Sequence, residues 1–354
     1  MRRILPYFLL SAAACAANSL DHRLDVLESQ MRELRIETVY GNFGANTASA
    51  YPYLTSWGLY FEGEAICWKF FLGGTDYVYV NQPNTSSTVL VDRLEYLNFD
   101  WRFAYRFTLG YQLDSPDLDL WATFTRFTTD QNTKAKQPIG VNSRLFPNQN
   151  VAQNVDYMNA SASCDFAYNV LDISLGRNYF LRKTFSMHPF IGLRGAKIDE
   201  RTKMTWEGSV LSDYDYKSSN DFWGLGILGG TEARWHFDSN WSLFGSLLGS
   251  LLYGWYDVDT TIQQIYPSAV KDLDLDSDLR RVVPNMMTDV GVTWEYVPCQ
   301  RRVRFALTLA YEFQYWWAYN QTLHTKSGTL QYAWDRLAED FGMQGVKFNF
   351  GLDF

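Results

Sequence analysis

The chain of 354 residues has few histidines, few cysteines and no long apolar run. None of its four histidines stands in an HExxH pair or a serine-hydrolase signature, which excludes the enzyme classes that such motifs mark. A Gly-rich phosphate loop and a CxxC pair are also missing, so the sequence indicates no nucleotide or dithiol site. Because no apolar run reaches the ~20 residues that a membrane-spanning helix needs, a helical membrane protein is excluded as well.

The cysteines limit disulfide bonding. Cys15 lies in an N-terminal leader, which leaves Cys67, Cys164 and Cys299, an odd number. At most one internal disulfide can then form, and one thiol is left over. The alternative is that all three are unpaired small apolar residues.

Aromatic residues are abundant, at 17% of the chain, while the mean hydropathy is only -0.25. In a membrane β-barrel only every second residue meets lipid, so the average stays polar, and girdles of Trp and Tyr mark both interfaces. The net charge of -8 and the pI of 5.1 give no indication of nucleic-acid binding.

The strongest pattern is strict alternation of apolar and polar residues. In the last ten residues one face of a strand carries Val346, Phe348, Phe350, Leu352 and Phe354. Ranges 99–113, 223–237 and 302–317 repeat the pattern, with an apolar residue at nearly every odd position. The sequence therefore predicts an all-β protein, a transmembrane up-and-down antiparallel β-barrel.

One segment, Trp241 to Trp255, is apolar on both faces and places Gly245 and Gly249 four residues apart, as in pairs of membrane helices. It is too short to span a bilayer as a helix. We therefore expect a strand there, with the serines facing inward, namely Ser242, Ser246 and Ser250.

Short turns are expected near 114–117, 183–184, 238–240 and 298–300, and long polar loops at 81–96, 129–156, 199–221, 257–281 and 319–340. Their alternation is typical of periplasmic turns and extracellular loops. Counting back from Phe354 with both termini in the periplasm gives ten strands. Twelve is the alternative, because Trp57 to Val80 and Tyr157 to Leu181 could each hold two.

The N-terminal region is expected to stay outside the barrel. Residues 1–17 have a basic start, an apolar centre and a small-residue box at Ala14-Cys15-Ala16, which predicts a secretory signal peptide. A lipoprotein box with Cys15 lipidated is the alternative. Residues 18–55 contain an amphipathic stripe from Leu20 to Leu34, which predicts a short periplasmic helix, either a coiled coil or a helix on the barrel mouth, followed by a linker. Residues 56–354 form the predicted barrel.

The polar faces of the predicted strands carry the candidate pore-lining charges. These are Asp100, Arg102, Arg106, Glu232, Arg234, Arg302, Arg304, Glu312 and Lys347. Since paired arginines cannot line a dry core without cost, the inner face is expected to meet water. On the clearest strands arginine outnumbers acid, which favours weak anion preference.

Four aspartates in the expected loop at 257–281 alternate with other residues: Asp272, Asp274, Asp276 and Asp278. The row resembles a calcium loop, but its sixth position is Ser277 and its twelfth is Val283. We expect a solvated acidic loop rather than a metal site. No catalytic residue, cofactor or metal is predicted.

Several segments resemble one known family. They are SWGLYFEGEAICWK (Ser56 to Lys69), FDWRFAYRFTLGYQL (Phe99 to Leu113), DLDLWATFTRF (Asp117 to Phe127), YNVLDISLGRNY (Tyr168 to Tyr179), HPFIGLRGAKI (His188 to Ile198) and the terminal VKFNFGLDF. The family is that of the MOMP-like pore-forming outer-membrane proteins of Legionella and chlamydia-related bacteria. The resemblance implies a porin-type barrel in a Gram-negative outer membrane and transfers no catalytic residue.

The expected function is passive diffusion of ions and small hydrophilic solutes through the lumen. The alternatives are a closed structural or adhesin-type barrel that acts through its extracellular loops and, third, an outer-membrane hydrolase. Expected partners are outer-membrane lipid, small solutes, further copies in a trimer, and the barrel-assembly machinery, which would recognise the strand that ends at Phe354; nucleic acid is not expected.

Overall fold

The computed structural model describes residues 58–83, 90–113, 118–137, 144–147, 157–182, 184–208, 213–238, 240–266, 269–296, 303–326 and 333–353. The expected signal peptide and periplasmic helix lie outside these ranges. Within them, no helix is long and apolar enough to cross a bilayer.

The described part is built from β-strands that pair antiparallel with their neighbours. They are β1 (Leu59–Leu72), β2 (Asp76–Pro83), β3 (Leu90–Tyr96), β4 (Trp101–Gln112), β5 (Leu118–Lys136), β6 (Arg144–Pro147), β7 (Tyr157–Arg177), β8 (Tyr179–Arg182), β9 (Phe185–Gly208), β10 (Asp213–His236), β11 (Trp241–Tyr266), β12 (Ala269–Tyr296), β13 (Arg304–Lys326) and β14 (Ala333–Asp353).

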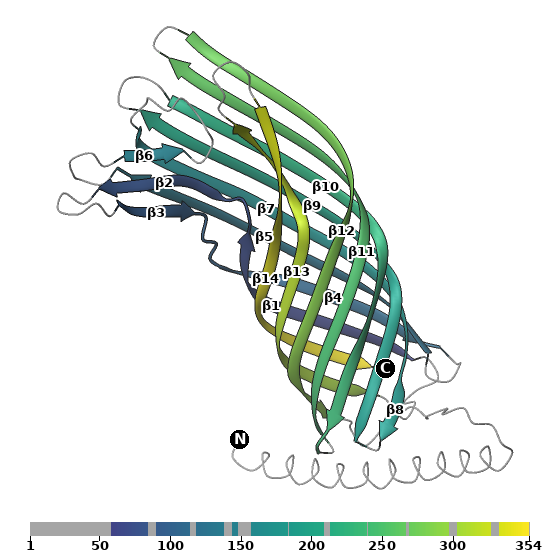
Figure 1. Ribbon diagram of the computed structural model, residues 1–354. Helices are drawn as coiled ribbons and strands as arrows, with labels where there is room; N and C mark the ends of the chain where they lie inside the picture. The colour runs from purple at the N-terminus through teal and green to yellow at the C-terminus, as the bar shows by residue number, and fades with distance from the viewer. Residues whose placement is uncertain are drawn as a thin grey trace, which may run out of the picture.

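Ten of these strands close into a barrel (Figure 1). The order around the wall is β1, β4, β5, β7, β9, β10, β11, β12, β13 and β14, and β1 pairs with both β4 and β14. The predicted fold class and strand count are confirmed. The twelve-strand alternative is wrong, because the range 57–80 supplies one wall strand plus β2, and the range 157–181 supplies one wall strand plus the short β8.

An apolar band covers the outer face of the wall. On β11 the outward positions run from Trp241 to Trp255 at every second residue, and the inward positions include the buried Ser242 and Ser250, as expected. The helical alternative for this segment is wrong. At one edge of the band Trp223 and Trp255 lie on neighbouring strands with ring centroids 4.8 Å apart. Such aromatic pairs mark the interface between lipid and water.

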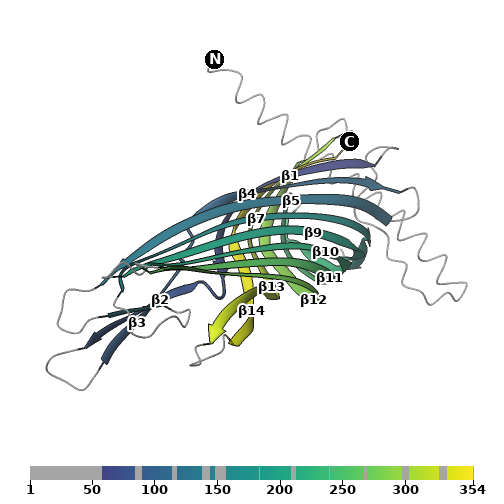
Figure 2. The same ribbon diagram turned by 90° about the horizontal axis from the view of Figure 1, so that it is seen from above.

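The two ends of the wall differ in how far the strands run beyond the apolar band, although at the far end β9 joins β10 and β11 joins β12 across equally short ranges, 209–212 and 267–268. Short connections join β4 to β5, β8 to β9, β10 to β11 and β12 to β13, and we call this the short-turn end. At the opposite, long-hairpin end, β9, β10, β11 and β12 extend as long paired strands (Figures 1 and 2), and their pairing continues well beyond the outward Trp223 and Trp255. Two predicted loops, 199–221 and 257–281, are largely strand there. Beyond the lipid the alternation is reversed: outward side chains such as Asp257 and Asp276 are polar, and the inward Val258 and Ile262 are buried. Acidic residues at every second position led these strands to be interpreted as loops.

A small sheet lies at the long-hairpin end. Strand β2 pairs with β3 on one side and with β6 on the other. Tyr77 and Leu145 of this sheet are buried, and the indole Nε1 of Trp206 on β9 donates a hydrogen bond of 2.9 Å to the backbone oxygen of Tyr77. The sheet is therefore packed on the extended wall strands.

Candidate functional site

A cavity of about 540 Å³ occupies the barrel interior on the side of the short-turn end. Its lining includes residues that adjoin the short connections, such as Gln112, Asn240 and Tyr296. Farther along the barrel interior, away from the short-turn end, the cavity is lined by Arg106, Arg194 and Tyr168. The cavity thus extends from the short-turn end to the middle of the barrel.

Charged side chains from most of the wall strands line this cavity. Eight acids line it, namely Glu62, Glu64, Asp119, Asp172, Glu232, Asp289, Glu295 and Asp353, and five bases do so, namely Arg106, Arg194, Arg234, Arg304 and Lys347. The carboxylates are in excess, so the field in the cavity favours cations.

The innermost charges form one network that joins five strands. Arg106 on β4 donates hydrogen bonds of 2.7 Å to Glu64 on β1 and of 2.8 and 2.9 Å to Glu312 on β13. Lys347 on β14 forms an ion pair with Asp289 on β12 and lies 3.6 and 3.7 Å from Glu64 and Glu312. All five side chains are nearly fully buried. Pairing of this quality offsets the cost of burying the charges.

A second buried pair lies beside this network. Arg194 on β9 binds both carboxylate oxygens of Asp172 on β7, at 2.7 and 2.6 Å, and also donates to the side-chain oxygen of Asn285 on β12. The planar guanidinium matches a carboxylate in this two-point geometry. The pair fixes an arginine at the inner end of the cavity.

Nearer to the short-turn end the charges are less buried. Arg234 lies 2.7 Å from both Glu232 and Glu295, and Arg304 forms an ion pair with Asp353. Beside them His188 on β9, the register partner of Glu232, places Nε2 2.9 Å from Asp119 on β5. These pairs surround the wider part of the cavity.

Between the buried charge network and the long-hairpin end, the barrel interior is filled by aromatic side chains. We call this the aromatic layer: Trp68, Phe70, Phe99, Phe127, Phe166, Tyr168, Phe222, Tyr256, Trp316, Tyr319 and Phe341, each no more than 2% exposed. Ring centroids lie 4.3 Å apart for Phe70 and Phe166 and 4.7 Å apart for Tyr319 and Phe341. The expectation of a polar inner face is therefore correct for the cavity and wrong for this layer. When both faces of a strand are apolar, the sequence does not show which face meets lipid and which packs inside the barrel.

A bulge in β13 places one of these rings. The register with β14 shifts between Trp316 and Asn320, and Ala318 has a φ of 51°. The carboxylate of Asp340 on β14 accepts hydrogen bonds of 2.6 Å from the backbone N of Ala318 and from the Tyr315 hydroxyl. The extra residue reverses the alternation, so Tyr319 faces inward although Trp317 faces out.

The structure brings most of the predicted pore-lining residues together. Arg106, Glu232, Arg234, Arg304 and Lys347 line the cavity, and Glu312 holds Arg106 at its inner end.

Two of the remaining candidates lie elsewhere. Asp100 precedes β4 and is exposed, and Arg102 forms an ion pair of 3.1 Å with Asp130 away from the cavity. Arg302 lies outside the described residues. Phe99, expected on the lipid face, lies in the aromatic layer, because the strand begins only at Trp101.

Sequence reasoning missed several lining residues, including Glu62, Asp119, Asp172 and Arg194. Their signal was present, since Glu62 and Glu64 alternate with the outward Phe61 on β1. The missed residues lie in strands that were not assigned face by face.

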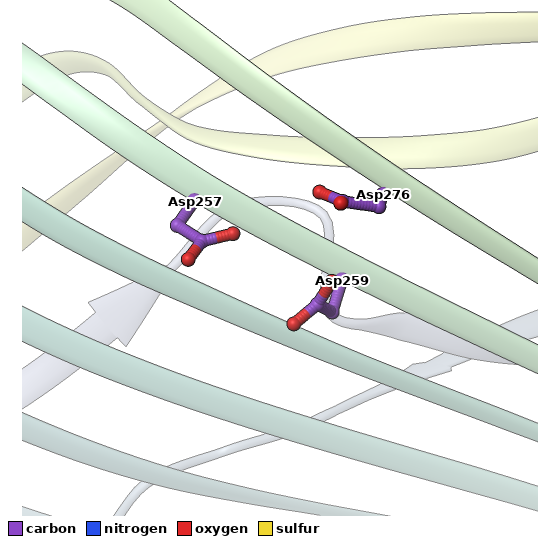
Figure 3. A group of neighbouring side chains, drawn as sticks. All are labelled: Asp257, Asp259 and Asp276. Atoms are coloured by element: carbon purple, nitrogen blue, oxygen red, sulfur yellow. The ribbon is translucent and has the colours of Figure 1, made fainter.

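Three exposed aspartates gather on the outer face beyond the apolar band. Asp257 and Asp259 on β11 and Asp276 on β12 have carboxylate oxygens within 4.8 Å of one another (Figure 3). The pKa of Asp257 is raised, first by desolvation and then by its neighbours Asp259 and Asp278. The expected acidic loop at 272–278 is a strand, so a calcium-loop geometry is wrong. Exposed carboxylates alone do not establish a metal site.

The chain was compared with curated proteins and with solved structures. No curated protein matches the sequence. Similar solved structures include the outer membrane protease OmpT from Escherichia coli, with 9% identity, TM-score 0.42 and coverage of 85% of this chain and 98% of that one. A FadL homologue from Pseudomonas aeruginosa has 8% identity, TM-score 0.26 and coverage of 88% and 93%. Likeness at this level says nothing about function.

One family model matches most of the chain, over residues 54–354. Its description is the major outer membrane protein precursor of Legionella pneumophila. The predicted resemblance and the outer-membrane location are thereby confirmed. The chain belongs to this family of major outer membrane proteins.

Proposed function

We propose that the protein is a channel for passive movement of ions and small hydrophilic solutes, with the charged cavity as its vestibule. The observation that carries the proposal is a cavity of about 540 Å³ inside a closed membrane barrel, lined by thirteen charged side chains. In outer-membrane barrels short turns face the periplasm, so the vestibule opens on the periplasmic side.

The aromatic layer lies between the vestibule and the long-hairpin end. Its rings are in mutual contact and almost inaccessible to solvent. Conduction therefore requires that part of this layer moves, and the structure represents the closed form of the proposed channel. Small barrels commonly fill their own interior, which makes such a closed form physically ordinary.

The proposed channel prefers cations. The vestibule has eight acidic and five basic side chains, whereas the sequence hypothesis of weak anion preference counted three strands only. The acids that reverse the balance, such as Glu64, Asp172 and Asp289, come from other strands. Low-dielectric walls focus the field of this excess within the vestibule.

Planar bilayers test the proposal. We expect discrete conductance steps from the purified, folded protein, and under a KCl gradient a reversal potential on the cation side. Replacing Glu232 and Asp353 with their amides should move the reversal potential toward zero, because both line the wider part of the vestibule. A folded protein that never conducts contradicts the proposal.

The aromatic layer favours a second candidate, a permanently closed barrel that acts through its surface. The extra sheet of β2, β3 and β6 at the long-hairpin end offers such a surface. Absence of conductance in both the native protein and a variant with the layer removed supports this candidate over the channel.

A further inference from the structure

Three polar residues stand in one row on the outer face of neighbouring strands. Arg126 on β5 is the register partner of Asn169 on β7, which in turn is the register partner of Lys197 on β9. Both cations are exposed, and Asn169 is half-buried. Since neighbouring strands lie about 4.8 Å apart, the two cationic residues flank Asn169 across roughly 10 Å of wall.

At its Lys197 end the row lies at the edge of the apolar band, and at its Arg126 end the exposed Tyr105 and Phe103 of β4 flank it. Continuing around the wall, Lys197 pairs in register with Trp223, and Trp223 pairs with Trp255, the aromatic pair that marks the interface. One outer-face position nearer to the short-turn end, Phe124 and Leu171 are exposed apolar side chains. Arg126, Asn169 and Lys197 therefore meet the headgroups of the outer leaflet.

Gly195 leaves a gap between side chains below the row on the lipid-facing side. Gly195 stands between Leu171 and Leu225, its register partners on β7 and β10, which are both 48% exposed. A Cβ added at Gly195 would meet no atom closer than 3.9 Å. An acyl chain can lie in this gap between the two leucines, directly beneath the polar row.

We propose that Arg126, Asn169 and Lys197, the basic row, bind a phosphate group of a lipid A-type glycolipid in the outer leaflet, with one acyl chain over Gly195. Guanidinium and ammonium groups form charge-assisted hydrogen bonds to phosphate, and the amide adds a neutral donor. Basic clusters at the edge of a membrane span attract anionic headgroups in this way.

The neighbouring charges restrict where the phosphate can sit. One position farther from the membrane the outer face carries Asp199, Asp221 and Asp257, joined in register across β9, β10 and β11. Asp199 lies 3.9 Å from Lys197. These three carboxylates repel a phosphate group placed beside them, farther from the membrane. The phosphate is therefore confined to the basic row itself. The proposal rests on the outer-membrane location and does not depend on channel activity.

Native mass spectrometry of the detergent-solubilised protein with bis-phosphorylated lipid A tests the proposal. We expect the double variant Arg126→Gln/Lys197→Gln to bind at least tenfold more weakly than the native protein. Dephosphorylated lipid A should bind both proteins equally. The matched control, Lys203→Gln/Lys217→Gln, removes the same charge from β9 and β10 farther from the membrane, and its affinity should stay within about twofold of native.

Three results would overturn the proposal: an equal loss in the control pair, equal affinity of the native protein for both forms of lipid A, or displacement of lipid A by inorganic phosphate at matched concentration. The last would make the row a site for free anions. Heat-modifiable migration verifies that each variant is folded. If the double variant does not fold, Lys197→Gln alone carries the same test, with an expected loss of about threefold.

Discussion

Arg106 on β4 and Glu312 on β13 are joined across the lumen by two hydrogen bonds of 2.8 and 2.9 Å. Along the wall β1 and β14 lie between their strands, so the pair bridges the interior rather than following the sheet. It closes the inner end of the vestibule just below the aromatic layer, where Tyr168 also lines the cavity. The pair therefore links the stability of the barrel to the proposed path for ions.

Removing one partner of this pair should destabilise the barrel strongly. Glu312 is 0% exposed and Arg106 is 5% exposed, so Glu312→Ala leaves a buried cation short of its main partner. We expect a loss of roughly 3 to 5 kcal/mol in the free energy of unfolding. Urea titration followed by the gel mobility of folded and unfolded forms measures it. Arg102→Met, at a half-exposed ion pair, should cost less than about 1 kcal/mol.

The two faces of β13 should respond in opposite ways to a new charge. Leu309 is 60% exposed on the lipid face, whereas the neighbouring Thr308 lines the vestibule. Leu309→Arg should cost about 2 to 4 kcal/mol near the bilayer midplane, and Thr308→Arg much less. Unfolding in lipid vesicles measures both. Equal costs would contradict the face assignment. Ala104 also faces inward, but an arginine there should not be tolerated as well as at Thr308, because Ala104 pairs in register with Phe127 of the aromatic layer.

The bulge in β13 stores strain at Ala318, whose φ of 51° suits glycine better than alanine. Ala318→Gly should therefore stabilise the barrel by about 1 kcal/mol. The matched control is Ala310→Gly in the regular part of the same strand, which should destabilise by a similar amount. Both values come from urea unfolding, and a loss at both positions would show that the bulge is not strained.

A buried carboxylate should make stability depend on pH. Glu200 faces inward on β9 beyond the apolar band, where its outer-face neighbours are Asp199 and Arg201. It faces Asn220 and Thr202, and burial raises the pKa of its carboxyl from 4.5 to about 7.

The folded state thus holds a proton that the unfolded state releases, so stability should fall as pH rises from about 4.5 through 7. Glu200→Gln should remove this dependence, and Asp165→Asn, at an exposed carboxylate, should keep it. Unfolding curves at pH 5 to 8 test both, and an unchanged slope in Glu200→Gln would refute the assignment.

Assembly through the C-terminal strand stays a prediction, since Phe354 lies outside the described residues. Its strand β14 does close the barrel against β1, with Phe348 paired to Ala65. Deletion of Phe354 should lower the amount of heat-modifiable protein in the outer membrane, whereas Leu352→Val should not. Unchanged levels after the deletion would remove its role as an assembly signal.

Sequence alone predicted the wall where lipid imposes alternation. On β4 Phe103 is 80% exposed and Arg106 is buried, as their parity predicts. It failed where acidic residues were interpreted as a loop, because Asp272 to Asp278 alternate with other residues and extend as strand beyond the membrane, and it failed at Tyr319, which changes face because of a bulge. The partners of Arg106 were also beyond prediction, because Glu312 lies 206 residues away in the chain and meets it only across the closed barrel.

The conductance of a variant that thins the aromatic layer tests the central claim most directly. Trp316→Ala/Tyr319→Ala removes two fully buried rings from the layer, and Trp317→Ala removes a lipid-facing ring from the same strand. If the vestibule continues into a gated pore, the double variant should show larger or more frequent conductance steps than the native protein in planar bilayers, with cation preference retained, while Trp317→Ala should match the native protein. A folded double variant that conducts no more than Trp317→Ala would contradict the account.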